Sequence, residues 1–187
     1  MNQQLIKAIK EKALEFGDFT LKNGLKSNFY IDMRKLVLSG LLYTIVEELH
    51  AALRSANQDQ FDAIGGFDAI GGDDGSPSVI VGGYLALKAK SDMRGFVVRK
   101  NKKDHGKKDG IIGSIKTGDR CVIVEDVTTT GNSLLMVCDE IRKFGASVVK
   151  AITIVDRLEG AGEAMAKANI PFQSLVTIRS LKTDGGT

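Results

Sequence analysis

The chain has 187 residues, which is enough for one domain with a substantial core and too few for two ordinary domains. Hydrophobic residues make up 43% and charged residues 26%, and the formal net charge of +3 is too small to indicate a nucleic-acid-binding protein by itself. The two cysteines, Cys121 and Cys138, argue against a metal site or a disulfide framework and fit a reducing compartment. The charged N-terminus is unlike a signal peptide and no apolar run is long enough for a membrane span, so we expect a cytoplasmic protein.

The N-terminal region predicts a helix followed by a hairpin. Apolar residues recur at helical spacing and predict an amphipathic helix over residues 3–16 that ends near Gly17. The stretch FTLKNGLKSNFYIDMRKL, residues 19–36, resembles two short strands around a turn at Asn23 and Gly24. A second amphipathic helix is expected after Ser39.

Beyond residue 60 the pattern changes to strands that alternate with helices. Short apolar runs predict strands at 61–64, 95–98, 121–124, 148–155 and 174–178. Helical stretches are expected between most of them, at 79–90, 133–144 and 160–168. Because each strand is apolar on both faces, we expect an α/β fold with a central, mostly parallel sheet flanked by helices. The chain would form a single domain, with residues 1–60 as a hood at the edge of a core formed by residues 61–187.

A tandem hexapeptide, FDAIGGFDAIGG, occupies residues 61–72. A repeat architecture needs at least about three stacked units, so two copies do not predict one. The favoured interpretation is a loop insertion. The alternative is a Gly-rich loop close to a phosphate, and the GGDDGS sequence that begins within the second copy keeps that alternative open.

The most informative motif is CVIVEDVTTTGNS, residues 121–133, in which an expected strand is followed by Glu125 and Asp126. Open α/β sheets bind ligands at the carboxyl ends of their strands. Small residues in TTTGNS leave backbone N–H groups exposed at a helix N-terminus, and such groups bind a phosphate monoester. Two acids would repel that phosphate, so we expect them to bind ribose hydroxyls. The plainer alternative is an acidic cap on a packing helix.

A basic segment, RKNKKDHGKKDG, covers residues 99–110, and half of its residues are Lys or Arg. Such a run is most often a solvated loop or a nucleic-acid-binding patch. It contains no aromatic residue for base stacking. We therefore expect a flap that closes over a charged pyrophosphate and excludes water from it.

These motifs together resemble a known family. CVIVEDVTTTGNS resembles the phosphoribosyl-pyrophosphate motif of the type I phosphoribosyltransferases, although Thr128 stands where an aliphatic residue is more usual. RK-x-x-KDHG is similar to the catalytic loop of the orotate phosphoribosyltransferases, whose FTLxSGxxSxxYxD hairpin resembles FTLKNGLKSNFYID. IVDRLEG, residues 154–160, matches their strand that ends in Asp-Arg. The poorest match is residues 65–78, which are longer and more acidic than the corresponding loop.

The resemblance implies transfer of a phosphoribosyl group from phosphoribosyl pyrophosphate to orotate, with Mg²⁺ held mainly by the substrate and no metal ligand assigned to the protein. It implies that Lys100, Lys103 and His105 are catalytic and that Thr129 and Arg157 face orotate. The residues implied to bind phosphoribosyl pyrophosphate are Lys26, Arg99, Lys100, Lys103, His105, Glu125, Asp126, Val127, Thr128, Thr129, Thr130, Gly131, Asn132 and Ser133.

Plainer roles remain open for two of these residues, because Arg157 could form a surface ion pair with Glu159 and Lys26 could be a turn lysine. Two alternative functions also remain: transfer to a purine or to uracil, and regulation by sensing phosphoribosyl pyrophosphate. The resemblance further implies a homodimer whose 99–110 flap is shared across the interface. Association with an orotidine monophosphate decarboxylase is possible, and no nucleic-acid or membrane partner is expected.

Overall fold

The computed structural model describes residues 3–20, 24, 26–54, 61–68, 76–87, 92–99 and 110–182. The elements in chain order are α1 (Gln3–Lys12), β1 (Leu14–Thr20), β2 (Lys26–Ile31), α2 (Met33–Val37), α3 (Leu42–Arg54), β3 (Ala63–Asp68), α4 (Ser76–Leu87), β4 (Arg94–Arg99), β5 (Ile111–Gly113), β6 (Arg120–Thr128), α5 (Asn132–Phe144), β7 (Ser147–Asp156), α6 (Ala161–Lys167), β8 (Phe172–Thr177) and α7 (Ile178–Lys182).

Within the described residues, the central sheet has six strands in the order β5-β4-β3-β6-β7-β8. All neighbouring pairs are parallel except β4 and β5. This arrangement confirms the expected mostly parallel sheet. The antiparallel edge strand β5 was not predicted, because a strand of three residues carries too little periodic pattern to be recognised.

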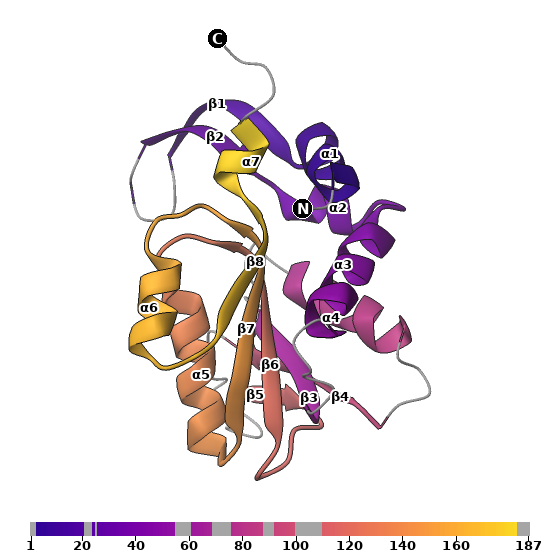
Figure 1. The fold of residues 1–187 in the computed structure, drawn as a ribbon, viewed down its shortest axis with the longest axis vertical. Coiled ribbons are helices and arrows are strands. Elements are labelled where there is room, and N and C mark those ends of the chain that lie inside the picture. The colour runs from indigo at the N-terminus through magenta and orange to yellow at the C-terminus, as the bar shows by residue number, and fades with distance from the viewer. Residues whose placement is uncertain are drawn as a thin grey trace.

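Both faces of the sheet are covered by helices. On β6, Val122 and Val124 share a core with α3 and α4, whereas Cys121 and Ile123 share the other core with α5. All four side chains are fully buried, which explains why the strand reads as a continuous apolar run. Figure 1 shows α5 and α6 on one side of the sheet and α3 and α4 on the other. The predicted helical stretches 133–144 and 160–168 correspond to α5 and α6.

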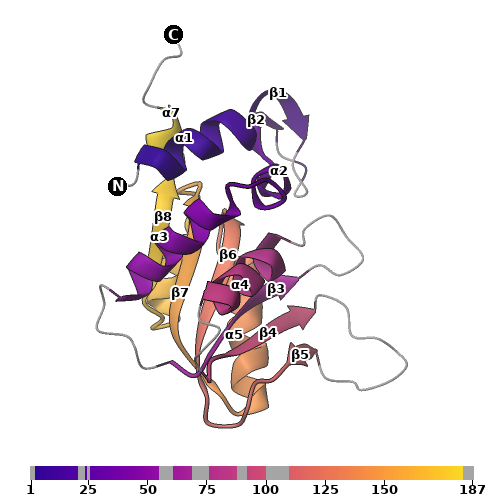
Figure 2. The same cartoon turned by 90° about the vertical axis from the view of Figure 1, so that its right-hand side faces the viewer.

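The N-terminal elements cover the carboxyl ends of the strands as well as one face. In Figures 1 and 2, α1, α2 and the β1–β2 hairpin lie beyond the ends of β6, β7 and β8. α3 packs beside α4 on the sheet face, where its Leu49 belongs to the same core as Leu5 of α1 and Ile64 of β3. The hood is therefore placed over the end of the sheet where ligands bind in open α/β folds.

The predicted first helix was too long. α1 ends at Lys12, and Phe16 lies in β1 with 71% of its surface exposed. β1 pairs with β2 in antiparallel register, with Phe16 opposite Phe29, so a nonlocal pairing overrides the helical spacing. The expected hairpin is confirmed, and Gly24 has the positive φ of +82° that suits its turn. Asn23 lies outside the described residues.

The strand predicted at 61–64 is confirmed in part, because β3 begins at Ala63, but the prediction of a loop insertion was wrong for residues 65–68, which continue this strand. A Cβ on Gly65 would collide with the ring and carbonyl oxygen of Phe96, and one on Gly66 would collide with the carbonyl oxygen of Val124. The first Gly-Gly pair therefore lets neighbouring strands approach closely. Residues 69–72, the end of the tandem hexapeptide, lie outside the described residues.

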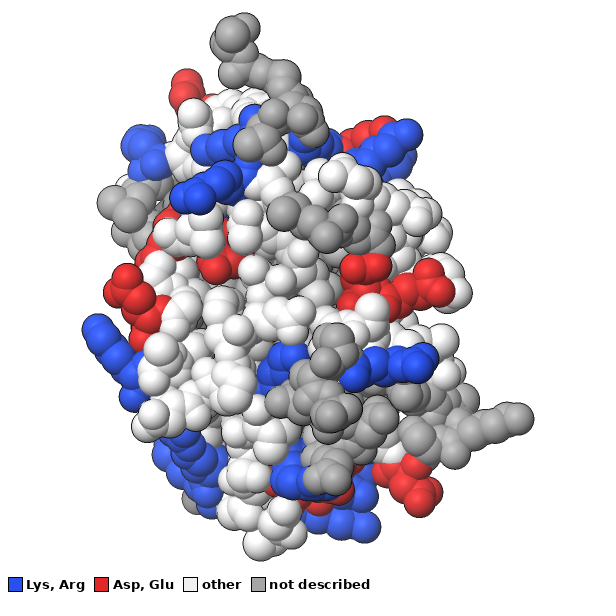
Figure 3. Space-filling view, viewed as in Figure 1, with Lys and Arg blue, Asp and Glu red and all other residues white. Residues whose placement is uncertain are grey.

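Charged side chains are dispersed on the face drawn in Figure 3. Basic residues stand there in several separate groups with acidic residues between them, and the described part of this face carries no continuous basic stripe. Among the described residues, no helix is long and apolar enough to cross a membrane.

Candidate functional site

Charged side chains from three strands meet at the carboxyl edge of the sheet. Arg99 ends β4, Glu125 lies near the end of β6, and Arg157 directly follows β7. β3 lies between β4 and β6, and β7 lies on the other side of β6, so these strand ends form one edge. The sheet topology therefore brings together residues that are far apart in the sequence.

β6 runs four residues further than predicted and ends at Thr128. Glu125 and Asp126 consequently lie within the strand rather than after it, and their carboxyl groups interact with each other. Glu125 is buried, with 6% of its surface exposed, whereas Asp126 is half-buried. The two acids thus have different environments although they are adjacent in the chain.

The carboxyl group of Glu125 is electrostatically unsatisfied. Its Oε2 is buried and has no hydrogen-bond partner among the described residues. Burial raises the pKa of this carboxyl well above its usual value, and the nearby charge of Asp126 raises it further, while a hydrogen bond with the Ser133 side chain acts in the opposite direction. A proton, a cation or a hydroxyl donor at this position would relieve the cost of burying the charge.

The Asp126 carboxylate is held by the backbone of the next residue. Its Oδ1 accepts a hydrogen bond from the Val127 N–H at 2.7 Å. The half-buried carboxylate is therefore fixed in orientation at the end of the sheet. A fixed acceptor of this kind suits a ligand hydroxyl.

The resemblance implied that Thr128 binds phosphoribosyl pyrophosphate, and the structure places its hydroxyl inside the sheet. Thr128 is 1% exposed, and its hydroxyl donates to Thr153 Oγ1 at 2.9 Å, which in turn donates to the Val155 carbonyl at 3.1 Å. A buried hydrogen bond between neighbouring strands explains how a threonine replaces an aliphatic residue here.

The turn from β6 into α5 has the geometry that suits an anion. Gly131 is the N-cap of this 13-residue helix, and among the described residues it provides no side-chain cap for the first N–H groups. Unsatisfied N–H groups at a helix N-terminus attract a phosphate. Thr130 and Asn132 are exposed beside them, and Thr129 and Ser133 are half-buried. Val127, predicted to bind the same ligand, pairs with Val155 of β7.

The backbone at position 131 strongly favours glycine. Its φ is +86°, in the left-handed region, and a Cβ would lie 3.2 Å from the Ala161 Cα at the start of α6. The turn therefore has both a conformational and a steric reason for this residue. Close packing against α6 fixes the position of the first N–H groups of α5.

Arg157 lies in a buried setting between β7 and the hairpin. Its backbone N–H donates to the Thr128 carbonyl at 2.9 Å, and its Nε–H donates to Glu159 Oε1 at 2.8 Å. The guanidinium carbon lies 4.5 Å from the centroid of the Phe29 ring. The alternative contact with Glu159 does form, and it joins an Arg157 side chain that is 8% exposed to a Glu159 side chain that is 36% exposed.

The structure describes only some of the other predicted site residues. Lys26 is exposed on β2 and its Nζ donates to Thr20 Oγ1 at 2.7 Å, beside a hollow of about 480 Å³ in the hairpin. Arg99 has a buried Nε with no partner among the described residues, and its backbone N–H donates to the Gly110 carbonyl at 2.8 Å. Lys100, Lys103 and His105 lie outside the described residues.

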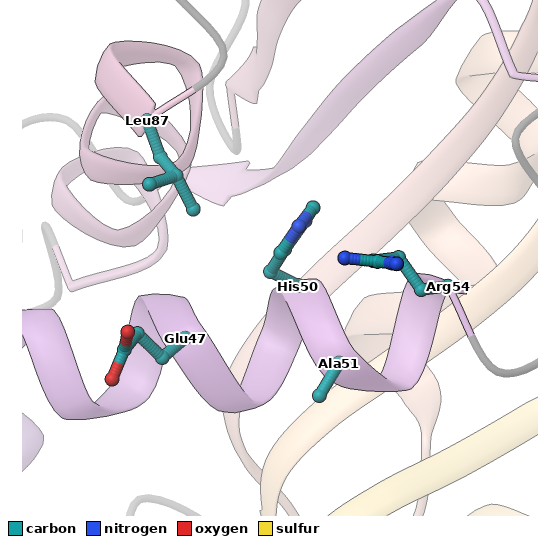
Figure 4. A pocket seen from close by; sticks show the side chains of 5 residues that line it. All are labelled: Glu47, His50, Ala51, Arg54 and Leu87. Carbon is teal, nitrogen blue, oxygen red and sulfur yellow. The ribbon is translucent and has the colours of Figure 1, made fainter.

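A separate hollow of about 500 Å³ lies between α3 and α4, lined by Glu47, His50, Ala51, Arg54 and Leu87 (Figure 4). Leu87 is the last residue of α4, whose first residue follows the carboxyl end of β3. A 12-residue helix is about 18 Å long, so this end of the hollow is about one helix length from the edge described above.

Comparison with known proteins identifies the family. Residues 77–173 match the model of the phosphoribosyl transferase domain. Over 181 residues the chain is 38% identical to the orotate phosphoribosyltransferase of Methanocaldococcus jannaschii, with 96% of each chain covered. The chain belongs to the orotate phosphoribosyltransferase family.

Solved structures agree with this membership. The orotate phosphoribosyltransferase of Mycobacterium tuberculosis in complex with phosphoribosyl pyrophosphate is similar with a TM-score of 0.74 and 26% identity, over 95% of this chain and 96% of that one. The UMP synthase of Leishmania donovani is similar with a TM-score of 0.79 and 28% identity, over 95% of this chain but 36% of that one. The expected type I phosphoribosyltransferase fold is thereby confirmed.

Two features of this family member escaped the sequence analysis. Phe29, which contacts Arg157, lies in the recognised hairpin motif, but nothing local shows that its ring reaches β7. Ser76, at the start of α4, has a buried hydroxyl without a partner among the described residues. It belongs to the stretch that matched the family pattern least, so no motif marked it.

Proposed function

We propose that this protein transfers the 5-phosphoribosyl group from phosphoribosyl pyrophosphate to orotate, giving orotidine 5′-monophosphate and pyrophosphate, a step of pyrimidine synthesis. The observation that carries the proposal is the end of β6, where a buried, unsatisfied Glu125 lies before an uncapped α5 N-terminus. A ribose 5-phosphate complements both parts, with hydroxyls for the acids and an anion for the amides. Membership of the orotate phosphoribosyltransferase family supports the acceptor.

The predicted site residues would bind different parts of the two substrates. Backbone N–H groups at Gly131–Ser133 and the Thr130 hydroxyl hold the 5′-phosphate, while Glu125 and Asp126 accept hydrogen bonds from the ribose hydroxyls. Thr129 and Arg157 face orotate, because a guanidinium fork matches a planar carboxylate. The predicted pyrophosphate contacts are Lys26, Arg99, Lys100, Lys103 and His105.

The reaction needs no protein nucleophile. A bond forms between an orotate ring nitrogen and C1′ while the C1′–oxygen bond breaks and pyrophosphate leaves with the electron pair. The proton of that ring nitrogen passes to water. The sugar carbon is transiently positive, so the negative field of Asp126, and of Glu125 when a bound cation offsets the cost of its buried charge, stabilises it more than it stabilises the substrate. Catalysis would rest on positioning and charge stabilisation, for which one well-placed donor is worth about 3–4 kcal/mol.

The residues of this edge fit a Mg²⁺ ion that the substrate largely holds. Carboxylate oxygens such as those of Glu125 and Asp126 are the ligands that Mg²⁺ prefers. Within the described residues, no group of three or more His, Cys, Asp and Glu side chains lies together. Most ligands would therefore come from substrate oxygens and water, and the ion would neutralise pyrophosphate charge.

The remaining parts of the proposal concern the setting. The family resemblance supports a homodimer with a shared 99–110 flap, which light scattering coupled to size-exclusion chromatography would test. The similarity to a UMP synthase that is much longer than this chain supports association with an orotidine monophosphate decarboxylase.

The composition supports a cytoplasmic location. We also propose that residues 1–60 and 61–187 act as one domain, because α1, α3 and β3 share a core.

The direct test mixes the protein with Mg²⁺, phosphoribosyl pyrophosphate and orotate and follows the fall in orotate absorbance. We expect a fall that requires all components. Adenine and uracil serve as alternative acceptors in parallel reactions. Turnover of either of these without turnover of orotate would replace the proposed acceptor and leave the family unchanged.

A further inference from the structure

Phe29 lies at the junction of three elements around Arg157. It belongs to β2 of the hairpin, is 7% exposed, and its ring centroid lies 4.5 Å from the Arg157 guanidinium carbon and 4.3 Å from Lys182 Nζ of α7. Both distances are within the range of about 6 Å in which a cation is attracted to an aromatic face. One ring therefore connects the hairpin, the end of β7 and the C-terminal helix.

The contacts of Arg157 leave one part of its guanidinium for a ligand. Glu159 takes the Nε–H, and the Phe29 ring covers the guanidinium carbon. Neither terminal nitrogen has a hydrogen-bond partner among the described residues. Those two nitrogens form the end of the fork that binds a carboxylate in a bidentate manner. Glu159 and Phe29 thus restrict rotation of the side chain without occupying its binding end.

The backbone of Phe29 is fixed independently of Arg157. The Ser27 hydroxyl donates to the Phe29 carbonyl at 2.7 Å, and Phe29 pairs with Phe16 across the hairpin. Attraction to two cations also has a cost, because Lys182 and Arg157 repel each other. The ion pair with Glu159 at 2.8 Å reduces that repulsion on the Arg157 side.

We propose that Phe29 is a positioning residue whose ring holds the Arg157 guanidinium so that its terminal nitrogens face the carboxylate of the acceptor substrate. This inference rests on the proposed function, since it takes orotate as the acceptor. It assigns the hairpin a role in acceptor recognition that acts through Arg157. Orotate affinity should then depend on the hairpin ring, whereas phosphoribosyl pyrophosphate affinity should not.

The test compares Phe29→Leu, which keeps an apolar side chain but removes the ring face, with Phe29→Tyr, which retains the ring. In Phe29→Leu the KM for orotate should rise about fivefold, equivalent to about 1 kcal/mol, with the KM for phosphoribosyl pyrophosphate unchanged. Phe29→Tyr should stay near the wild type. Phe16→Leu is the matched control, because Phe16 is the cross-strand partner of Phe29 but is 71% exposed.

A second measurement does not depend on turnover. In the NMR spectrum of ¹⁵N-arginine-labelled protein, the Arg157 Nε–Hε signal should carry a ring-current shift that Phe29→Leu removes and Phe29→Tyr retains. An unchanged signal in Phe29→Leu would overturn the proposal, as would equal rises in KM for both substrates. Absence of orotate turnover in the wild type would reject the proposed function, while the NMR result would still decide whether Phe29 orients Arg157.

Discussion

Glu125 near the end of β6 and Arg157 after β7 are charged residues at the same edge of the sheet, but they differ in the partners that surround their charges. Glu125 on β6 has a buried oxygen without a partner among the described residues and lies beside a second acid, Asp126. Arg157 after β7 has Glu159 at 2.8 Å and the Phe29 ring at 4.5 Å. The β6 end is destabilised until a ligand arrives, whereas the β7 end is organised beforehand. Substitution of Glu125 should therefore lower activity and raise the free energy of unfolding, whereas substitution of Arg157 should lower both.

The largest expected effect comes from Gly131→Ala in the turn after β6. Its positive φ should cost about 1–2 kcal/mol of unfolding free energy, and the clash with Ala161 should displace the α5 N–H groups and lower kcat/KM about 100-fold. Gly118→Ala is the matched control, because φ is also +86° there but a Cβ would meet nothing within 4 Å. Denaturant unfolding and kinetics on both variants should give a stability loss that is at least as large in Gly131→Ala as in Gly118→Ala, with activity lost only in Gly131→Ala. Equal activity in the two would contradict an anion site at this turn.

Glu125→Gln should separate activity from stability. The variant should lose activity about 100-fold, because the ribose contact and the negative field disappear. The folded-state pKa of Glu125 is raised, so its contribution to stability is complete below the unfolded-state pKa and is lost as pH rises through the folded-state pKa. Replacing it with a neutral amide should raise the unfolding free energy at pH 8 and change it much less at pH 4.

Urea unfolding of Glu125→Gln at both pH values checks this sign, with the exposed Glu163→Gln as control. If the variant is less stable than the wild type at pH 8, the Glu125 carboxylate has favourable partners in the folded protein. That result would contradict the difference proposed between Glu125 and Arg157.

Arg157→Ala tests whether the partners of Arg157 hold it in place before a ligand binds. Removing the guanidinium should raise the KM for orotate about tenfold or more and leave the KM for phosphoribosyl pyrophosphate unchanged. Stability should fall as well, because Glu159 and Phe29 lose their shared partner. Steady-state kinetics with each substrate varied in turn, together with thermal unfolding, provide the measurement. If Arg157→Ala is more stable than the wild type, the Arg157 charge is destabilising in the folded protein, as is proposed for Glu125.

The smallest effect is expected for Thr128→Val, which removes the hydroxyl that links β6 to β7. Loss of this buried hydrogen bond should lower the unfolding free energy by about 1 kcal/mol, with kcat/KM close to the wild-type value. Thr130→Val, exposed in the same turn, should show the reverse pattern of retained stability and reduced kcat/KM. If Thr128→Val instead loses activity at unchanged stability, its hydroxyl binds the ligand.

Local patterns predicted most of the sheet and the family. Apolar runs indicate β4, β7 and β8, because a strand covered on both faces is continuously hydrophobic. Glu125 and Asp126 with the small residues that follow them indicate the sugar phosphate site, since the strand, the turn and the helix start are contiguous in the chain. The type of site could thus be predicted wherever its parts are neighbours in sequence.

The rest depends on contacts between distant segments. Phe16 continues a helical spacing, but its backbone pairs with β2, and this pairing decides its structure. The direction of the Thr128 hydroxyl follows from how far β6 extends, which is set by pairing with β7. The packing of Phe29 on Arg157 joins segments more than a hundred residues apart in the chain. No periodicity within either segment encodes it.

The most direct measurement of the central claim is a crystal structure of the protein with phosphoribosyl pyrophosphate. The account predicts the 5′-phosphate against the first N–H groups of α5, with the ribose hydroxyls toward Glu125 and Asp126. A 5′-phosphate bound at any other place, with the α5 N-terminus occupied only by water, would contradict it.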